Sequence, residues 1–409
     1  MLHRIWLGFF VLGFMSALAQ WLLAGDADVF QRMVKASFDM ASLSVELSIG
    51  LVGVLSLWLG IAALGEASGL MAKLANGLSP LFTRLMPEVP KGHPAISSMT
   101  LNLSANALGL DNAATPLGLK AMQDLQALNP QKDTASNAQI LFLVLNTSSV
   151  TLFPITVLLY RAQLGAADPA AVFIPILLAT SCSTLVGLLV TAWVQKIKLR
   201  DTVVLAYLGI AFAVLLSMVA YFSTLGVTEL QRQSSLVSNL MILSVIMLFL
   251  LVAHQKQVNV YDTFIEGAKQ GFQVAIEIIP FLLAMLVAIG IFRASGALDS
   301  GIDLIRDGVS FLGMDTRFVD ALPTALMKPL SGSGARAMMV DTMNSYGVDS
   351  FQGLLAATIQ GSTETTFYVL AVYFGSVGIR HGRHALTCGL SADFAGIAAA
   401  IAAAYWFYG

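Results

Sequence analysis

A chain of 409 residues would ordinarily fold into two or three soluble domains, at ~150 residues per domain. The composition excludes that architecture. Hydrophobic residues make up 57% of the chain and charged residues only 11%, whereas globular proteins average about 25% charged residues. Because a soluble protein of this length needs many more charged groups on its surface, and because the mean hydropathy is +0.78, the sequence predicts an integral membrane protein.

The charges, cysteines and histidines exclude further classes of protein. The net charge of -2 combines 22 basic and 24 acidic residues without a long basic block, so no nucleic-acid partner is expected. Cys182 and Cys388 lie in apolar segments without a CxxC motif, and we expect both to be small buried side chains. The five histidines lack metal-ligand spacing, so we expect no metal site and no cofactor.

Membrane spans are expected wherever ~20 predominantly apolar residues follow one another, the length that a helix needs to cross the hydrocarbon core. Eight stretches clearly qualify, and they are roughly 5–24, 43–65, 138–160, 171–194, 203–225, 236–253, 275–293 and 385–408. A ninth stretch, 351–373, qualifies if its polar centre is tolerated. The first stretch could instead be a secretory signal, because Ala17-Leu18-Ala19 resembles a cleavage site, but we interpret it as a span.

Two long segments, 66–137 and 294–350, mix Gly, Pro, Ser and Asn with apolar stretches too short to span. Backbone of this kind survives at membrane depth only where it is buried in protein or lines a cavity. Each segment is therefore predicted to form a re-entrant hairpin.

The second half of the chain repeats the first at a nearly constant offset. The offset is 214 residues between the polar segments 146–149 and 360–363, and 213 residues between Ala192-Trp193 and Tyr405-Trp406. Earlier, Ala67-Ser68-Gly69 matches Ala294-Ser295-Gly296 at an offset of 227. We therefore predict an all-α membrane protein with two repeats, each with two spans, a re-entrant hairpin and two further spans.

The expected domains are a first repeat over 1–197, a connecting transmembrane helix over 198–231, and a second repeat over 232–409. Four spans plus one connector are an odd number, so the second repeat is expected to have inverted topology. Lys196, Lys198 and Arg200 mark a cytoplasmic loop and place the N-terminus inside. Inverted repeats are typical of secondary transporters, whose sites lie near the midplane where the repeats meet.

The first candidate binding segment is the turn of the first hairpin, over 106–118. A glycine and a proline break the helix there, which leaves Asn106, Asn112 and Thr115 available to bind a ligand. A polar loop at the surface is the alternative.

The matching turn of the second hairpin contains Ser331, Gly332 and Ser333. Glycines permit a close backbone approach, and free N–H groups here could face an anionic or polar substrate. Such a run is often an ordinary linker, but its counterpart in the first hairpin favours a site.

Two of the expected spans have polar centres, 146–149 and 360–366, which favour a break in the helix that exposes backbone groups to a ligand or ion. Packing through small hydroxyl side chains is the alternative. An intramembrane carboxylate such as Glu364 costs several kcal/mol and favours a functional role. The candidate binding residues here are Asn146, Thr147, Ser148, Gln360, Ser362, Thr363 and Glu364.

Other charged residues near the expected spans are weaker candidates. Glu364 and Asp393 are both candidates for ion coupling, although a structural, hydrogen-bonded role suits Asp393 equally well. Lys120 and Arg336, which match between the repeats, could contact an anionic substrate or simply anchor helix ends.

Three stretches carry a resemblance to a known family. The stretch 106–122, Asn-Ala-Leu-Gly-Leu-Asp-Asn-Ala-Ala-Thr-Pro-Leu-Gly-Leu-Lys-Ala-Met, closely resembles spore maturation protein A. The stretches 328–336 and 360–375 closely resemble spore maturation protein B. The chain looks like a fusion of the two, and the resemblance covers nearly all of it except the span 203–225.

That family belongs to the nucleoside recognition, or Gate-domain, group, whose distant relatives include concentrative nucleoside transporters and the membrane part of ferrous iron transporters. In the nucleoside transporters, each inverted repeat pairs a re-entrant hairpin with a broken helix, and substrate lies between the hairpin tips and the breaks. The resemblance therefore implies a substrate site made by 106–116, 146–149, 331–334 and 360–364.

We expect a secondary transporter of a small polar solute, nucleoside-like or a small organic metabolite, coupled to ions or protons, in the bacterial inner (cytoplasmic) membrane. Its partners would be the solute or ion and the lipid bilayer, and the sequence is compatible with a homo-oligomer. We do not expect an enzyme, because no span carries a central histidine and no HExxH or GxSxG motif occurs. A non-transporting structural or signalling protein on the same scaffold stays open.

Overall fold

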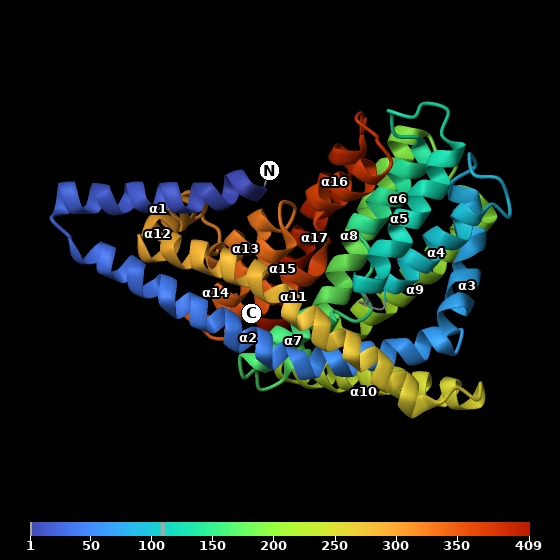
Figure 1. Cartoon of the computed structure of the whole chain (residues 1–409), viewed down its shortest axis with the longest axis horizontal. Coiled ribbons are helices and arrows are strands. Elements are labelled where there is room, and N and C mark those ends of the chain that lie inside the picture. Colours follow the sequence, from blue (N-terminus) through green and yellow to red (C-terminus); the bar gives the residue numbers. More distant parts are fainter. Residues whose placement is uncertain (1, 108–110) are drawn as a thin grey trace.

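The computed structural model describes residues 2–107 and 111–409. Apart from one isolated bridge between Thr134 and His381, these residues form helices, turns and loops (Figure 1). In chain order the helices are α1 (Leu2–Ala24), α2 (Asp28–Ala67), α3 (Leu70–Leu85), α4 (Pro94–Ala107), α5 (Asp111–Leu128), α6 (Asn137–Thr147), α7 (Ile155–Gln163), η1 (Pro169–Val172), α8 (Phe173–Gln195), α9 (Thr202–Ser223), α10 (Val227–Gln255), α11 (Val260–Ala294), α12 (Ala297–Phe311), η2 (Val319–Ala321), α13 (Leu322–Met327), α14 (Gly332–Tyr346), α15 (Phe351–Ser362), α16 (Thr366–Ser376) and α17 (Ala385–Tyr408).

The predicted class of all-helical membrane protein is confirmed. Among the described residues, five helices are long and apolar enough to cross a membrane: Trp6–Ala24, Pro169–Gln195, Thr202–Ser223, Glu229–Gln255 and Ala385–Tyr408. The pair Leu282–Ala294 and Ala297–Phe311, bent by 68°, passes the same test together.

Two of the helices are much longer than the spans expected within them. The stretch 43–65 lies inside the 40-residue α2, and 275–293 lies inside the 35-residue α11. At 1.5 Å per residue α2 extends for about 60 Å, twice the ~30 Å of the hydrocarbon core. The hydropathy marked only the apolar part, because polar residues continue each helix beyond it.

Glycines let α2 and α11 pack closely and antiparallel. A Cβ on Gly267 would lie 2.5 Å from the carbonyl oxygen of Leu59, and one on Gly271 would lie 2.4 Å from the Cα atom of Ser56. At the other end, Gly290 faces Met40. Small residues at such a crossing allow the two backbones to approach, as is typical of helix pairs in membranes.

The two segments expected to be hairpins each contain an amphipathic helix followed by a helix pair. The amphipathic helices, α3 and α12, both begin after a glycine in the left-handed region, Gly69 (φ 72°) and Gly296 (φ 70°). In the first segment α4 and α5 run antiparallel. Two hydrogen bonds show this: the Ser98 hydroxyl donates to Asp124, and the Asn102 amide donates to the carbonyl of Ala114. In the second segment α13 is short, and α14 packs against it.

The spans predicted with polar centres are interrupted helices. α6 ends at Thr147 and α7 begins at Ile155, while α15 ends at Ser362 and α16 begins at Thr366. Beside these breaks, α8 and α17 pack along each other in the centre of the molecule (Figure 1), where the Ser183 hydroxyl donates to the carbonyl of Ala392 at 2.9 Å.

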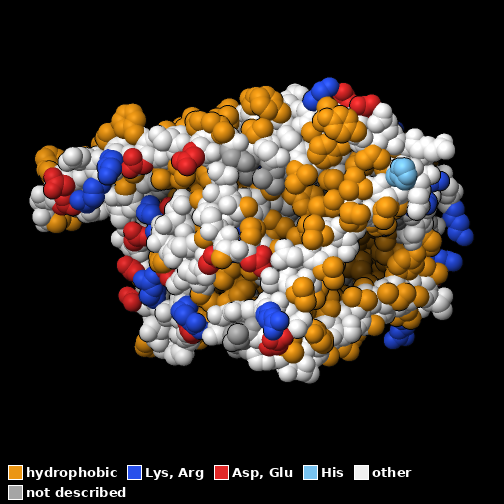
Figure 2. Space-filling view, turned by 90° about the horizontal axis from the view of Figure 1, so that it is seen from below, with side chains coloured by type: hydrophobic (Ala, Val, Ile, Leu, Met, Phe, Trp, Pro, Cys, Tyr) orange, Lys and Arg blue, Asp and Glu red, His pale blue; other side chains and the backbone are white. Residues whose placement is uncertain are grey.

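The outer helices expose apolar surface. The apolar windows of α1, α9 and α10 are only 11%, 6% and 17% buried, and hydrophobic side chains dominate the right-hand half of Figure 2. Lipid-facing surface explains this exposure. It also corrects one expectation: Cys388 is buried, but Cys182 is exposed on α8, since in a membrane protein an apolar segment does not imply burial in protein.

Candidate ligand-binding site between two broken helices

The ends of the two broken helices meet directly. The backbone N–H of Glu364, in the α15–α16 break, donates to the carbonyl of Thr147 at the end of α6, at 2.7 Å. A helix end leaves backbone groups without intrahelical partners, and here each break supplies the partner that the other lacks. A backbone hydrogen bond therefore connects the two halves of the chain at this point.

Each break also contacts the helix pair that precedes it. The N–H of Leu152 donates to the carbonyl of Ala107 at the end of α4, at 2.7 Å, and the N–H of Phe367 donates to the carbonyl of Pro329, between α13 and α14, at 3.0 Å. The two contacts correspond to each other in the two halves. The two breaks, the end of α4 and the turn after α13 thus converge in one region.

On the side of the first half, a chain of amides links the segments. The Asn106 side chain donates to Oδ1 of Asn146 at 2.9 Å, and Asn146 in turn donates to Oδ1 of Asn102. Asn102, which is completely buried, donates to the carbonyl of Ala114 at 2.7 Å and lies 3.5 Å from the Tyr373 hydroxyl. The amide chain therefore ties α4, α5, α6 and α16 together.

Asn102 is not among the residues predicted from the sequence, although the sequence carries a signal for it. Asn102 and Asn106 are four residues apart and so lie on one face of a helix. Two amides stacked in this way inside a membrane protein indicate a polar contact across helices.

On the side of the second half, Ser331 serves as the N-cap of α14. Its Oγ accepts from the N–H of Gly334 at 3.0 Å and lies 3.2 Å from Oγ of Ser333. A Cβ on Gly332 would lie 2.9 Å from Oγ1 of Thr365, so the start of α14 faces the α15–α16 break. The first turn of a helix carries partial positive charge, which suits a polar or anionic ligand.

Several of the predicted ligands make hydrogen bonds within their own helices. The hydroxyls of Thr147 and Ser148 both donate to the carbonyl of Val144, at 3.0 and 2.8 Å, and that of Ser362 donates to Ile359 at 2.8 Å. All three predicted side chains are completely buried. These three hydroxyls therefore fit the alternative interpretation, in which small hydroxyl side chains pack between helices. Only the backbone beside them forms the helix breaks.

A second group of buried polar atoms has no hydrogen-bond partner among the described residues. The group comprises Oε1 of Gln360, Oγ1 of Thr363, Oγ1 of Thr366 and both carboxylate oxygens of Asp393. Leaving a buried polar atom unpaired costs about 1–3 kcal/mol, and native proteins contain few of them. All of these atoms are oxygens, and all lie at or beside the α15–α16 break.

The remaining candidates differ in position. Glu364 is half-buried in the break, and its carboxylate acts electrostatically on Asp393. Thr115 is half-buried on α5, while residues 108–110 and the side chain of Asn112 lie outside the part that the structure describes. Lys120 forms a surface ion pair with Asp124 at 2.6 Å and is 61% exposed, which places it away from the breaks.

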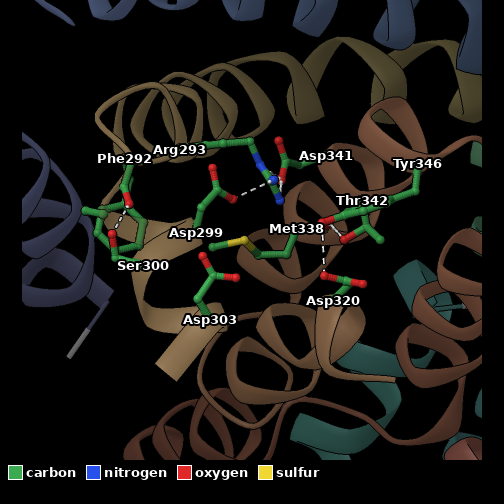
Figure 3. Close-up of polar contacts among 12 residues, drawn as sticks. Phe292, Arg293, Asp299, Ser300, Asp303, Asp320, Met338, Asp341, Thr342 and Tyr346 are labelled. Carbon is green, nitrogen blue, oxygen red and sulfur yellow. Dashed lines mark hydrogen bonds and ion pairs between the residues drawn. The ribbon is translucent and has the colours of Figure 1, made fainter. Parts of the chain in front are cut away.

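A cluster of ion pairs holds the second helix pair to its surroundings (Figure 3). Nη2 of Arg293, at the end of α11, lies 2.6 Å from Oδ2 of Asp341 on α14, and its Nη1 lies 3.1 Å from Asp299 on α12. Beside them, Arg306 pairs with Asp320 at 2.6 Å, and the Tyr346 hydroxyl donates to the same carboxylate at 3.0 Å.

The described residues contain no group of three or more His, Cys, Asp or Glu side chains placed to hold a metal ion. Two hollows on the described surface lie outside the region where the breaks meet. One is formed by the loop 129–138 with Glu88 and Arg383, and another lies between the outer faces of α8 and α17.

Known proteins that resemble this chain match it in both of its halves. The family model for nucleoside recognition, called Gate, matches residues 48–166 and 275–380, which is more than half of the chain. Spore maturation protein B of Bacillus subtilis (strain 168) is 49% identical over 146 residues, 36% of this chain and 80% of that protein.

Spore maturation protein A of the same organism is 37% identical over 183 residues, 45% of this chain and 90% of that protein. The two matches cover the chain in two parts, as a fusion would. No solved structure matches the chain.

Proposed function

This chain belongs to the nucleoside recognition (Gate) family, and from that premise we propose that it is a secondary transporter of a small polar solute. The solute would be nucleoside-like or a small organic metabolite, coupled to an ion or to protons. The observation that carries the proposal is the convergence of two helix breaks, the end of α4 and the turn after α13, with the two breaks joined by the hydrogen bond from the N–H of Glu364 to the carbonyl of Thr147. Broken helices at a repeat interface are the usual binding geometry of secondary transporters.

The order of the elements supports two inverted repeats with re-entrant hairpins. A long helix, an amphipathic helix, a helix pair, a broken helix and a long final helix occur in α2–α8 and again, in the same order, in α11–α17. Both amphipathic helices follow a left-handed glycine in the sequence Ala-Ser-Gly. A duplicated unit explains this parallel, and α9 is the extra crossing that turns the second unit over.

The chemistry of the convergent region suits an uncharged or singly charged polar solute. The half-buried amide of Asn106, which bonds to Asn146, offers groups of the kind that pair with nucleobase edges or hydroxyl groups. The starts of α14 and α16 add backbone donors with partial positive charge. Glu364, half-buried in the break, is placed to contact the solute or a coupling proton.

Alternating access would move the breaks, both helix pairs, α8 and α17 against the crossed α2 and α11. The close glycine contacts between α2 and α11 suit a rigid frame, and an elevator motion of the remainder fits this division. The basic loop between α8 and α9, with Lys196, Lys198 and Arg200, supports a cytoplasmic N-terminus.

Transport by purified protein in liposomes tests the proposal. Uptake of radiolabelled nucleosides, organic acids and amino acids is compared for the parent protein and Glu364→Gln. The matched control is Glu266→Gln, because Glu266 is 71% exposed and pairs with Lys269 at the surface. We expect uptake of one class, lost in Glu364→Gln and retained in the control. If no solute is taken up and none raises the melting temperature, the proposal is wrong.

One observation favours a second function, a structural or signalling protein that keeps the scaffold without flux. The hydroxyls of Thr147, Ser148 and Ser362 are buried and bonded within their helices. In a background with Cys182 and Cys388 replaced by serine, Ser333→Cys distinguishes the two functions. A transporter exposes this thiol to a membrane-impermeant reagent and protects it with solute. A non-transporting protein leaves it unreactive from both sides.

A further inference from the structure

Asp393 is a buried carboxylate with neither oxygen hydrogen-bonded. It lies within α17, is 1% exposed, and both Oδ1 and Oδ2 lack a partner among the described residues. Because an isolated carboxylate in a low-dielectric interior is strongly unfavourable, buried charges in proteins are paired or coordinate a cation. Its surroundings therefore determine what it binds.

Two glycines aim this side of α17 at the α15–α16 break. A Cβ on Gly396 would lie 2.5 Å from Cγ2 of Thr363 and 3.0 Å from the carbonyl oxygen of Ser362, and one on Gly389 would lie 2.8 Å from Cγ2 of Thr366. Residues three and four apart share one face of a helix. Asp393 follows Gly389 by four residues and precedes Gly396 by three, so it shares their face.

The neighbours of Asp393 at the break are oxygen donors without partners of their own. The side chains of Thr363 and Thr366 both lie close enough to the Asp393 carboxylate to act on it, although their hydroxyls make no hydrogen bond of standard geometry, and Oε1 of Gln360 is also unpaired. Hydroxyl, amide and carboxylate oxygens without partners are the kinds of atom that coordinate a hard cation.

The end of α15 adds to this arrangement. Its last carbonyls have no intrahelical partners and carry partial negative charge, and the Ser362 carbonyl lies beside Gly396. Unwound carbonyls and half-helix C-termini are the groups that coordinate Na⁺ in secondary transporters.

The charges around the break leave room for one positive charge. Lys328, 3% exposed just before the turn of the second helix pair, acts on Asp393, as does Glu364. With both carboxylates ionised, these three groups sum to a single negative charge. Divalent sites normally use more carboxylates than this, so the charge matches a monovalent cation.

We propose that Asp393, Thr363, Thr366 and Gln360, together with the carbonyls at the end of α15, bind one sodium ion. This deepens the proposed function by naming the coupling ion. Binding of the ion stands independently, and only the statement that the ion is coupled to transport rests on the proposed function. A proton on Asp393 makes one hydrogen bond, whereas a metal ion contacts several of these oxygens at once. Sodium on Asp393 also weakens the attraction of Lys328 for that carboxylate, which links ion binding to the turn after α13.

The first half of the chain lacks this site. At the offset of 213 residues that aligns Ala192-Trp193 with Tyr405-Trp406, Thr180 corresponds to Asp393. The Thr180 hydroxyl is buried and donates to the carbonyl of Leu177 at 3.2 Å, so it needs no cation. The stoichiometry is therefore one sodium ion per chain, and Thr180→Val is a matched control.

The test is a sodium titration of thermal unfolding on the full chain in detergent, without solute, at constant ionic strength with choline as the replacing cation. The parent protein and Thr180→Val should melt higher as sodium rises, with one ²²Na⁺ bound per chain. Asp393→Asn should lose both effects. Thr363→Val, which keeps the charge and is the second variant if Asp393→Asn does not fold, should weaken half-saturation about tenfold, the effect of losing one neutral oxygen ligand.

Three results overturn the sodium site: melting of the parent protein that is indifferent to sodium, equal sodium response in Thr363→Val and the parent, or stabilisation that follows pH instead of sodium. The two proposals fail separately. Sodium binding without uptake of any solute leaves the site intact and removes the transporter, while uptake that needs no sodium and binds none removes only the site.

Discussion

The ion pair between Arg293 and Asp341 should determine how firmly the second helix pair is held (Figure 3). Nε of Arg293 donates to Oδ2 of Asp341 at 2.7 Å, and the two side chains are 19% and 8% exposed. Removing one partner of a buried pair costs about 3–5 kcal/mol, because the other charge is left uncompensated. Arg293 keeps a second partner in Asp299 at 3.1 Å, so we expect Asp341→Asn to cost about 2–4 kcal/mol of unfolding free energy.

A double-mutant cycle measures this coupling. Arg293→Met, Asp341→Leu and the double variant are compared with the parent protein by denaturant unfolding in detergent micelles. Since a buried pair can be replaced by apolar side chains of similar size at little cost, the double variant should be more stable than either single variant. Additive losses, with an interaction energy below about 0.5 kcal/mol, would refute the view that this pair fastens α14 to α11.

Three further predictions concern other parts of the molecule. Gly271→Val should lower the melting temperature, by overpacking worth about 1–3 kcal/mol, because its side chain would collide with the backbone of Ser56, whereas Gly209→Val on α9 meets nothing within 4 Å and should be neutral. Asn102→Ala should cost about 1–3 kcal/mol in thermal unfolding, since Asn146 loses its buried acceptor; an unchanged melting temperature would contradict the amide chain. Burial, and then the charge of Arg383, lower the pKa of His384 below 6.5; the folded protein therefore binds fewer protons, and its melting temperature should fall as the pH drops below about 6.5, but less so in His384→Gln.

The parts of the site that the sequence predicted are those encoded locally. The breaks at 148–154 and 363–365 follow from polar runs inside apolar stretches, because such residues cannot continue a lipid-facing helix. The turn after α13 was identified from its Ser-Gly pattern for the same reason.

What the sequence did not reveal depends on pairing between distant elements. The role of Asn102 arises only when α4 lies against α5 and α6, and that of Arg293 arises only when α14 brings Asp341 to the end of α11. The exposure of Cys182 depends on which face of α8 meets lipid. A hydropathy window averages over all faces of a helix, so it carries no information on any of these.

Contacts between the two halves indicate why they function as one chain. Arg161 from the first half, completely buried at its side chain, pairs with Asp349 of the second at 2.8 Å, and the N–H of Arg380 donates to the carbonyl of Asp133 at 2.8 Å. Together with the bond between Glu364 and Thr147, these contacts mean that neither half completes the convergent region alone.

The relatives that match each half are separate proteins. A covalent connection raises the effective concentration of one half for the other. Yet α9, which makes that connection, is only 6% buried and contributes little packing. Its contribution is therefore the covalent connection itself, which holds the two halves in one chain.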